Sequence, residues 1–364
     1  MIIETIELKD FRNYQSEATV FHEKTNIITG KNAQGKTNLI EAINLLSLGK
    51  SFRTKKESEM IRLGQPGCLV KGMFLKQGRS YGTAVELRTG GTKPHSFYIN
   101  GAEMDSVSDI LGGVYTVVFS PEDLRIVKGE PEARRRFLDR GLILLRPMYY
   151  HKLKKSRAVL KNRNAALKSD NVQADLLDVY DEQLAEAGAE VMEERFRHME
   201  ALAVEAKKAA ALLTDENEEI ETCYKPNILA VNATEAKDVF LETLRRGRER
   251  DIFTKSTETG PHRDDITFTV DGKDLKTFGS QGQQRTAAIA LRLSEKELVK
   301  NETGEDAILL LDDVMSELDA GRQKRLLERF GGNQIFVTAA TIDEKAAEFL
   351  GAVKFIRIED GKVI

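Results

Sequence analysis

Polar and apolar residues alternate over short stretches in the first 120 residues of the chain. A period of two is typical of β-strands, because successive side chains point to opposite faces of a sheet. One stretch differs, since Leu39, Ile40, Ile43 and Leu46 recur at helical spacing and Gly49 follows where a helix would end. The pattern predicts a helix over 36–48. It predicts strands over 2–8, 17–21, 25–29, 69–75, 81–88 and 96–100.

Long charged and amphipathic stretches replace the strand pattern between about residues 131 and 250, and they predict a helical insert. After Gly260 strands and helices alternate, which is typical of an α/β domain. The predicted strands there are 266–270, 307–311, 334–338 and 353–358, and the predicted helices are 283–299, 320–329 and 342–350. We therefore expect an α/β domain formed by 1–125 and 256–364, with a mainly helical domain inserted over 126–255.

A glycine-rich segment lies between the predicted strand 25–29 and the predicted helix 36–48. Gly30-Lys31-Asn32-Ala33-Gln34-Gly35-Lys36-Thr37 matches the phosphate-binding pattern G-x4-G-K-[ST], which requires this context. Lys36 would reach the β- and γ-phosphates, and Thr37 would bind Mg²⁺. We assign nucleotide binding to these residues and to Asn38, at the start of the helix, whose N-terminus favours anions. A plain glycine-rich turn is the alternative, which the flanking elements disfavour.

A second part of a nucleotide site follows the apolar run 307–311, which ends in Asp312 and Asp313. A continuous apolar run predicts a central buried strand. Asp312 is placed to hold Mg²⁺, directly or through a water, and Asp313 to orient and deprotonate the attacking water. The alternative is that the acids cap the next helix. Together with the P-loop, the acidic pair favours an ATPase whose catalytic residues are Lys36, Asp312 and Asp313.

The two halves of this site are about 275 residues apart, and no N-K-x-D guanine-reading motif is present. Between them lies Ser280-Gln281-Gly282-Gln283-Gln284, directly before a predicted helix. It resembles the signature segment of ABC-type ATPases, in which Ser280, Gly282 and Gln283 would bind nucleotide held by a second protomer. Alone the segment is a weak signal, and a polar helix cap is its alternative. Ser316-Glu317-Leu318-Asp319 resembles the D-loop of the same class.

The composition narrows the class of protein further. The 364 residues, 41% hydrophobic and 31% charged, suit roughly two globular domains. The longest apolar runs are far shorter than the ~20 residues of a membrane span, so we expect no membrane partner. Cys68 and Cys223 are isolated, which disfavours a disulfide framework or a zinc site and indicates a reducing cytoplasm.

These motifs together resemble the RecF family of DNA-repair ATPases, which is related to SMC heads and the wider ABC class. The resemblance extends over nearly the whole chain through segments 8–14, 30–37, 119–124, 134–139, 260–265, 280–284 and 311–314. It implies an ABC/SMC-type P-loop ATPase head of mixed β-sheet and helices, binding ATP and Mg²⁺. It also implies an ATP-dependent homodimer that binds duplex and gapped DNA and, with RecO and RecR, promotes RecA loading.

Two positions depart from the general ABC pattern. Asp313 stands where transporters have Glu, and Thr338 stands where many members have His. Both are compatible with slow, DNA-dependent hydrolysis that acts as a switch. Ser51-Phe52-Arg53 resembles a short basic loop near nucleotide and DNA in SMC heads, so Arg53 joins the predicted nucleotide site. The Gln-loop of the class has no clear equivalent, and 117–123 is the region expected to contain it.

The net charge of −3 hides a strong segregation of charge. Residues 134–163 contain eleven Lys or Arg and one acid, and a second basic cluster lies in 50–56. Such clusters suit sequence-independent contacts with DNA phosphates. The predicted DNA contacts are Lys55, Lys56, Arg134, Arg135, Lys154 and Lys155. A solvated helix face, or pairing with acids of the insert, is the alternative for 134–163. An ABC transporter subunit and a structural SMC-like protein remain alternative functions.

Overall fold

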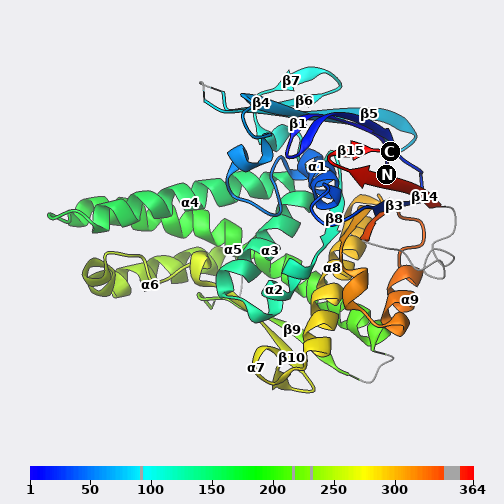
Figure 1. Ribbon diagram of the computed structural model, residues 1–364. Helices are drawn as coiled ribbons and strands as arrows, with labels where there is room; N and C mark the ends of the chain where they lie inside the picture. The colour runs from blue at the N-terminus through cyan, green and yellow to red at the C-terminus, as the bar shows by residue number, and fades with distance from the viewer. Residues whose placement is uncertain (91–92, 215–217, 230–232, 340–352) are drawn as a thin grey trace. The chain divides into compact units, whose positions relative to one another are not determined.

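The chain divides into two compact units in the computed structural model (Figure 1), which describes residues 1–90, 93–214, 218–229, 233–339 and 353–364. The first unit comprises Met1–Asp123 and Arg292–Ile364, and the second comprises Leu124–Leu291. The predicted helix over 342–350 lies outside the described residues. No helix in the described ranges has both the length and the apolar character needed to cross a membrane.

The first unit contains an antiparallel sheet with strand order β2-β1-β4-β5-β6-β7. Its strands include all those predicted in the first 120 residues except 25–29, and the alternating burial of β1 follows the alternating sequence. The sheet is formed by β1 (Ile2–Phe11), β2 (Tyr14–Val20), β4 (Gly67–Lys76), β5 (Arg79–Arg88), β6 (His95–Ile99) and β7 (Ala102–Met104).

A second sheet in the same unit has the order β15-β14-β3-β13-β12-β8. All its strands are parallel except β15, which pairs antiparallel with β14 at the edge. Its strands are β3 (Thr25–Thr29), β8 (Thr116–Phe119), β12 (Ile308–Asp312), β13 (Ile335–Ala339), β14 (Val353–Glu359) and β15 (Lys362–Val363). Every residue of β12 is buried, as predicted, and the strand lies inside the sheet between β13 and the edge strand β8.

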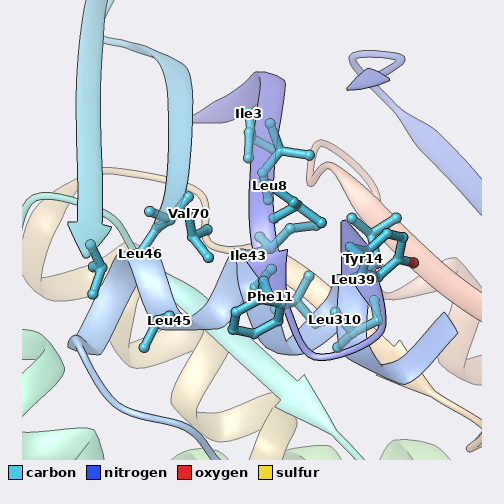
Figure 2. Close-up of a cluster of buried hydrophobic side chains, with 14 of the residues drawn as sticks. Ile3, Leu8, Phe11, Tyr14, Leu39, Ile43, Leu45, Leu46, Val70 and Leu310 are labelled. Carbon is cyan, nitrogen blue, oxygen red and sulfur yellow. The ribbon is translucent and has the colours of Figure 1, made fainter. Parts of the chain in front are cut away.

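Helix α1 (Lys36–Leu48) contacts strands of both sheets of the first unit. Its apolar residues Leu39, Ile43 and Leu46 pack with Val70 of β4 and Leu310 of β12 in one buried cluster (Figure 2). Even the polar residues of its middle turns are buried, because the helix is covered on more than one side. Apart from short 3₁₀ turns, the described part of this unit contains one other complete helix, α9 (Ala320–Glu328).

The second unit is mainly helical, as the insert was predicted to be. In Figure 1, α5 can be followed as a long helix packed against α4 and α6. The helices are α2 (Leu124–Lys128), α3 (Pro131–Leu145), α4 (Pro147–Leu167), α5 (Ala174–Leu213), α6 (Ala233–Thr254) and α7 (Leu275–Phe278). Helix α8 (Gln281–Thr303) begins in this unit and ends in the first.

A small antiparallel sheet in the second unit corrects the expected organisation. It has the order β11-β10-β9, with β9 (Ile220–Lys225), β10 (Asp265–Val270) and β11 (Lys273–Asp274). Strand β9 was not among the predicted strands, because it continues an acidic stretch inside the helical region. Because β10 pairs with β9 along its length, residues 256–291 group with the helical unit and not with the α/β unit.

Buried ion pairs hold the second unit together. Arg195 of α5 is almost fully buried and bonds to Asp139 of α3 at 2.8 Å, to Asp264 at 2.8 Å and to the carbonyl of Pro261 at 2.5 Å. A buried charge destabilises a protein unless an oppositely charged partner is buried with it, because burial removes the charge from water. Arg195 therefore ties α3 and the segment before β10 to the long helix.

Replacing Arg195 with Met should lower the free energy of unfolding by about 3 to 5 kcal/mol, because buried Asp264 would lose its ion-pair partner and Asp139 would keep only the exposed Arg157. Urea denaturation followed by circular dichroism measures the change. Arg197→Met is the matched control, since Arg197 is exposed on the same helix and, among the described residues, pairs only with Glu193, so its effect should stay within about 0.5 kcal/mol. Equal losses in the two variants would contradict a stabilising role of the buried network.

Candidate nucleotide-binding site

The P-loop connects β3 to α1, and glycine is required where the loop passes close to its neighbours. Gly30 has φ +144°, and a Cβ atom there would lie 2.3 Å from the carbonyl oxygen of Ile358 in β14. Gly35 has φ +119°, and a Cβ atom would lie 2.9 Å from the side chain of Asn13. These constraints explain the glycine spacing of the motif independently of any ligand.

Lys36 lies at the C-terminal end of this loop and folds back over it. Its ammonium donates to the carbonyl oxygens of Gly30 at 2.6 Å and Lys31 at 3.0 Å. Lys31, Asn32 and Ala33 are exposed. A cation held against the loop, together with the first free N–H groups of α1, provides the electrostatics that a polyphosphate needs.

Two hairpin turns hold the P-loop from outside. The carbonyl oxygen of Gln34 accepts from Asn13 Nδ2 at 2.8 Å and from the backbone of Gly361 at 3.1 Å. The hydroxyl of Tyr14 donates to the carbonyl of Gly35 at 2.9 Å. Asn13 and Tyr14 belong to a segment that carries the family resemblance, but no sequence signal predicted their role. Asn13 lies in the turn before β2 and Tyr14 is the first residue of that strand, and their contacts are with the P-loop about 20 residues away in sequence.

Thr37 and Asp312 meet although they are 275 positions apart in sequence. Thr37 Oγ1 donates to Asp312 Oδ1 at 2.8 Å, and Thr338 Oγ1 donates to the same oxygen at 3.0 Å. Burial raises the pKa of Asp312 above its usual value, although both hydroxyls and the charge of Arg53 oppose the rise. Oxygen ligands on adjacent side chains are what Mg²⁺ prefers, so Thr37 and Asp312 fit the predicted metal site.

Asp313 follows β12 in the left-handed region, with φ 57°. Its backbone N–H donates to Thr338 Oγ1 at 2.9 Å, and its side chain is exposed. The left-handed turn separates the two acids, since Asp312 is buried at the end of the strand while Asp313 reaches solvent. Thr338 therefore contacts both, which gives a structural reason for Thr at the position where many related ATPases have His.

The predicted signature segment lies in the second unit, at the start of α8. Ser280 Oγ accepts from the backbone of Gln283 at 3.2 Å, and Gln283 Oε1 accepts from the backbone of Ser280 at 2.8 Å. This reciprocal arrangement is a capping box, so the helix-cap interpretation of Ser280 is correct as local structure. Ser280 is exposed, and Gly282 is half-buried, so a capped and accessible helix start is compatible with phosphate binding as well.

The basic cluster 134–163 is largely neutralised within its own unit. Arg134 is buried and makes a bidentate contact with Asp265, so it does not fit the predicted role of a DNA contact. Arg135 donates to the backbone carbonyl of Asp264, and Lys155 pairs with Glu186. Further ion pairs of the cluster join Arg136 to Glu132, Arg146 and Lys152 to Glu194, Arg157 to Asp139, and Arg163 to Asp181 and Asp251.

Three of the predicted DNA contacts remain accessible to a phosphate backbone. Lys154 is exposed on α4, and the part of the chain that the structure describes provides no ion-pair partner for it. Lys55 and Lys56 are exposed in the loop that precedes the 3₁₀ turn Glu57–Met60 of the first unit. The segment 117–123, expected to contain the Gln-loop, forms β8 and a 3₁₀ turn and contains no glutamine.

Comparison with known proteins identifies relatives over the whole chain. The family described as RecF/RecN/SMC N terminal domain matches residues 2–359. A protein of Bacillus cereus (strain B4264) named DNA replication and repair protein RecF is 39% identical over 371 residues, covering 100% of this chain and 98% of the relative. A protein of the same name from Bacillus thuringiensis (strain Al Hakam) is also 39% identical over 100% of this chain and 98% of its own length.

Solved structures agree with these relatives. Two structures of the recombination mediator protein RecF are 35% identical with a TM-score of 0.91, and they cover 99% and 100% of this chain and 97% of their own. The Smc head domain of Pyrococcus furiosus, 17% identical with a TM-score of 0.57 over 100% of this chain and 96% of that one, shares the fold. The fold is thus that of an ABC/SMC-type P-loop ATPase head, and this chain belongs to the RecF family of DNA replication and repair proteins.

Proposed function

We propose that this protein is an ATP-dependent switch that binds DNA during recombinational repair and replication restart. The observation that carries the proposal is the hydrogen bond between Thr37 and Asp312, beside Lys36 at the start of α1. It joins the two halves of a nucleotide site that the sequence separates. The similar solved RecF structures are named RecF-ATP and RecF-ATPrS in the RecFOR pathway, which supports ATP as the nucleotide.

Each residue of the site has a distinct task in this proposal. Backbone N–H groups of 30–38 and the ammonium of Lys36 bind the phosphates, while Thr37 and Asp312 hold Mg²⁺, which neutralises charge on the phosphates when bound. Asp313 accepts a proton from the attacking water, for which its exposed position at the end of the strand is suitable. An aspartate is shorter than a glutamate, so we expect slow hydrolysis that resets the switch and is stimulated by DNA.

Dimerisation completes the site in this proposal. Ser280, Gly282 and Gln283 of one protomer bind the γ-phosphate of nucleotide held by Lys36, Thr37 and Asp312 of the other, so that ATP closes the dimer on duplex DNA near single-strand gaps. RecR, together with RecO, is the partner that the family resemblance suggests, with RecA loading as the outcome. The exposed, capped start of α8 supports this arrangement. The cytoplasmic location stays a prediction of the sequence.

The full-length similarity to RecF disfavours the alternative functions of transporter subunit and structural SMC-like protein. In this proposal 256–364 acts with 1–125 in ATP hydrolysis, and 126–255 is a separate functional part. Residues 256–291 pack with the helical unit, but they contain the signature segment proposed to act in the ATPase cycle.

Substitutions in the P-loop and at the acidic pair should separate ATP binding from hydrolysis. Lys36→Met should weaken ATP binding about ten- to hundredfold, because it removes a charged hydrogen-bond donor from the phosphates. Asp313→Asn should leave ATP binding within about twofold and lower kcat by about 10² to 10⁴, the contribution of a general base. Equilibrium binding of a fluorescent ATP analogue and phosphate release measure the two effects. Unchanged hydrolysis in Asp313→Asn would remove Asp313 from its assigned role.

Ser280→Arg should abolish ATP-dependent DNA binding while it leaves ATP binding by the monomer intact, because the bulky cation would block the surface proposed to close on the partner. Fluorescence anisotropy of labelled gapped, duplex and single-stranded DNA, with and without ATP and Mg²⁺, tests this. Lys36→Met should lose the same ATP dependence. Gln281→Ala, next to Ser280 but without a cap contact, is the control. DNA binding that ignores ATP in the unsubstituted protein would overturn the clamp itself.

Charge reversal should distinguish the accessible lysines from the paired ones. Lys56→Glu and Lys154→Glu should each weaken DNA binding and reduce the slope of log K against log salt by about 1, as expected when one phosphate contact is lost. Lys93→Glu is the control, since Lys93 lies on the surface and pairs with Glu103. If Lys56→Glu and Lys154→Glu have the same salt slope as Lys93→Glu and the unsubstituted protein, neither predicted lysine contacts the phosphate backbone.

A further inference from the structure

Glu41 is a fully buried carboxylate on α1, five residues after Lys36, and it bonds to two arginines. Arg12 donates from Nε to Glu41 Oε2 at 2.8 Å and from Nη2 to Oε1 at 2.6 Å. Arg53 Nη1 approaches Oε2 at 3.4 Å. The side chains of Glu41, Arg12 and Arg53 are 0%, 15% and 40% exposed. One carboxylate is shared by two guanidinium groups, so these three side chains together carry one net positive charge.

Ser51 connects this carboxylate to the loop that carries Arg53. Its hydroxyl donates to Glu41 Oε1 and accepts from the backbone N–H groups of Arg53 at 2.9 Å and Thr54 at 3.1 Å. A hydroxyl that bonds two successive backbone donors fixes a tight turn. The turn is therefore anchored to a buried group of α1, although the loop itself lies at the surface.

The guanidinium of Arg53 is hydrogen-bonded through Nη1, while Nε and Nη2 have no acceptor among the described residues. Arg53 Nη1 also donates to Asn38 Oδ1 at 2.8 Å, and Asn38 Nδ2 donates to Asn13 Oδ1 at 2.8 Å, next to the P-loop. Among the described residues only Asn38 and Glu41 accept from this side chain, both through Nη1, which leaves Nε and Nη2 as donors for a ligand. The charge of Arg53 is close enough to Asp312 to oppose the burial-driven rise in the pKa of that carboxyl.

Arg53 is already expected at the nucleotide site, and we propose that Glu41 and Ser51 are positioning residues that hold its guanidinium beside the P-loop in the orientation that binds a phosphate. The ligand chemistry is a phosphate oxyanion, which a planar guanidinium binds through paired N–H donors. Two sources can supply it, the terminal phosphate of a nucleotide or the DNA backbone. The proposal rests on the proposed function, since it places Arg53 at a nucleotide site that ATP occupies.

The test compares Ser51→Ala, Arg53→Ala and the double variant in two separate assays. One assay measures binding of a fluorescent ATP analogue with Mg²⁺ and without DNA, and the other measures duplex DNA binding without nucleotide. Arg53→Ala should weaken binding about tenfold in at least one assay, which identifies the source of the phosphate. Ser51→Ala should produce a loss of similar size in the same assay. The double variant should be no weaker than Arg53→Ala, because Ser51 acts through Arg53.

Three controls keep a structural effect apart from positioning. Ser51→Thr, which retains the hydroxyl, should restore binding, and Ser58→Ala, an exposed serine of the neighbouring turn, should have no effect. The melting temperature of Ser51→Ala should match that of the unsubstituted protein. Glu41→Gln, in contrast, should weaken binding and also lower the melting temperature, because Arg12 loses a buried charge partner.

Losses that multiply in the double variant, or unchanged binding in Ser51→Ala or in Arg53→Ala, would overturn the proposal. Failure of the proposed function is distinguished by Lys36→Met. If the unsubstituted protein and Lys36→Met bind the ATP analogue equally weakly, the nucleotide site itself is wrong. If only Lys36→Met loses binding and the Ser51 and Arg53 variants do not in either assay, the site is right and the positioning role is wrong.

Discussion

Burial of α1 between two sheets is the constraint on which the first unit depends. The helix fills the space between an antiparallel and a mainly parallel sheet, and its apolar residues join the core of both. A helix covered in this way has little freedom to shift or rotate, because protein interiors are packed densely. Its N-terminus is therefore fixed at the carboxyl ends of β3, β12 and β13, where Lys36, Thr37 and Asp312 converge. Packing of apolar side chains thus sets the geometry of the phosphate site.

Signals confined to a short stretch of sequence were sufficient for much of this architecture. The alternating segments formed strands, and the apolar run that ends in Asp312 formed a fully buried strand between β13 and β8 of the mainly parallel sheet. The P-loop lies between a strand and a helix as its motif requires. In each case the pattern that carries the prediction and the structure that results lie within about ten residues, so no knowledge of distant partners was needed.

Features that depend on distant partners could not be predicted in the same way. The basic cluster 134–163 looked like a surface for DNA, but Arg134 is paired with Asp265, and its burial is set by a strand 131 positions away. The same strand draws residues 256–291 into the helical unit through β9, whose acidic flank hid it. Glu41 was unremarkable in sequence, because its role comes from arginines on two other segments. A cluster of basic residues in a sequence therefore indicates a binding surface only if those residues have no acidic partners within the folded protein.

A buried ion pair joins the two points at which the chain passes from one unit to the other. Arg292, where α8 enters the first unit, bonds to Asp123 at 2.6 Å, and Asp123 in turn accepts from the backbone of Ser120 at 2.8 Å, just after β8. β8 pairs in parallel with β12, the strand that ends in Asp312. The part of α8 that belongs to the first unit is thus anchored next to β8, the neighbour of the strand that ends in Asp312. Arg292 also pairs with Glu295 at 2.6 Å, so it is the buried carboxylate of Asp123 that a break in this pair would leave without its cation.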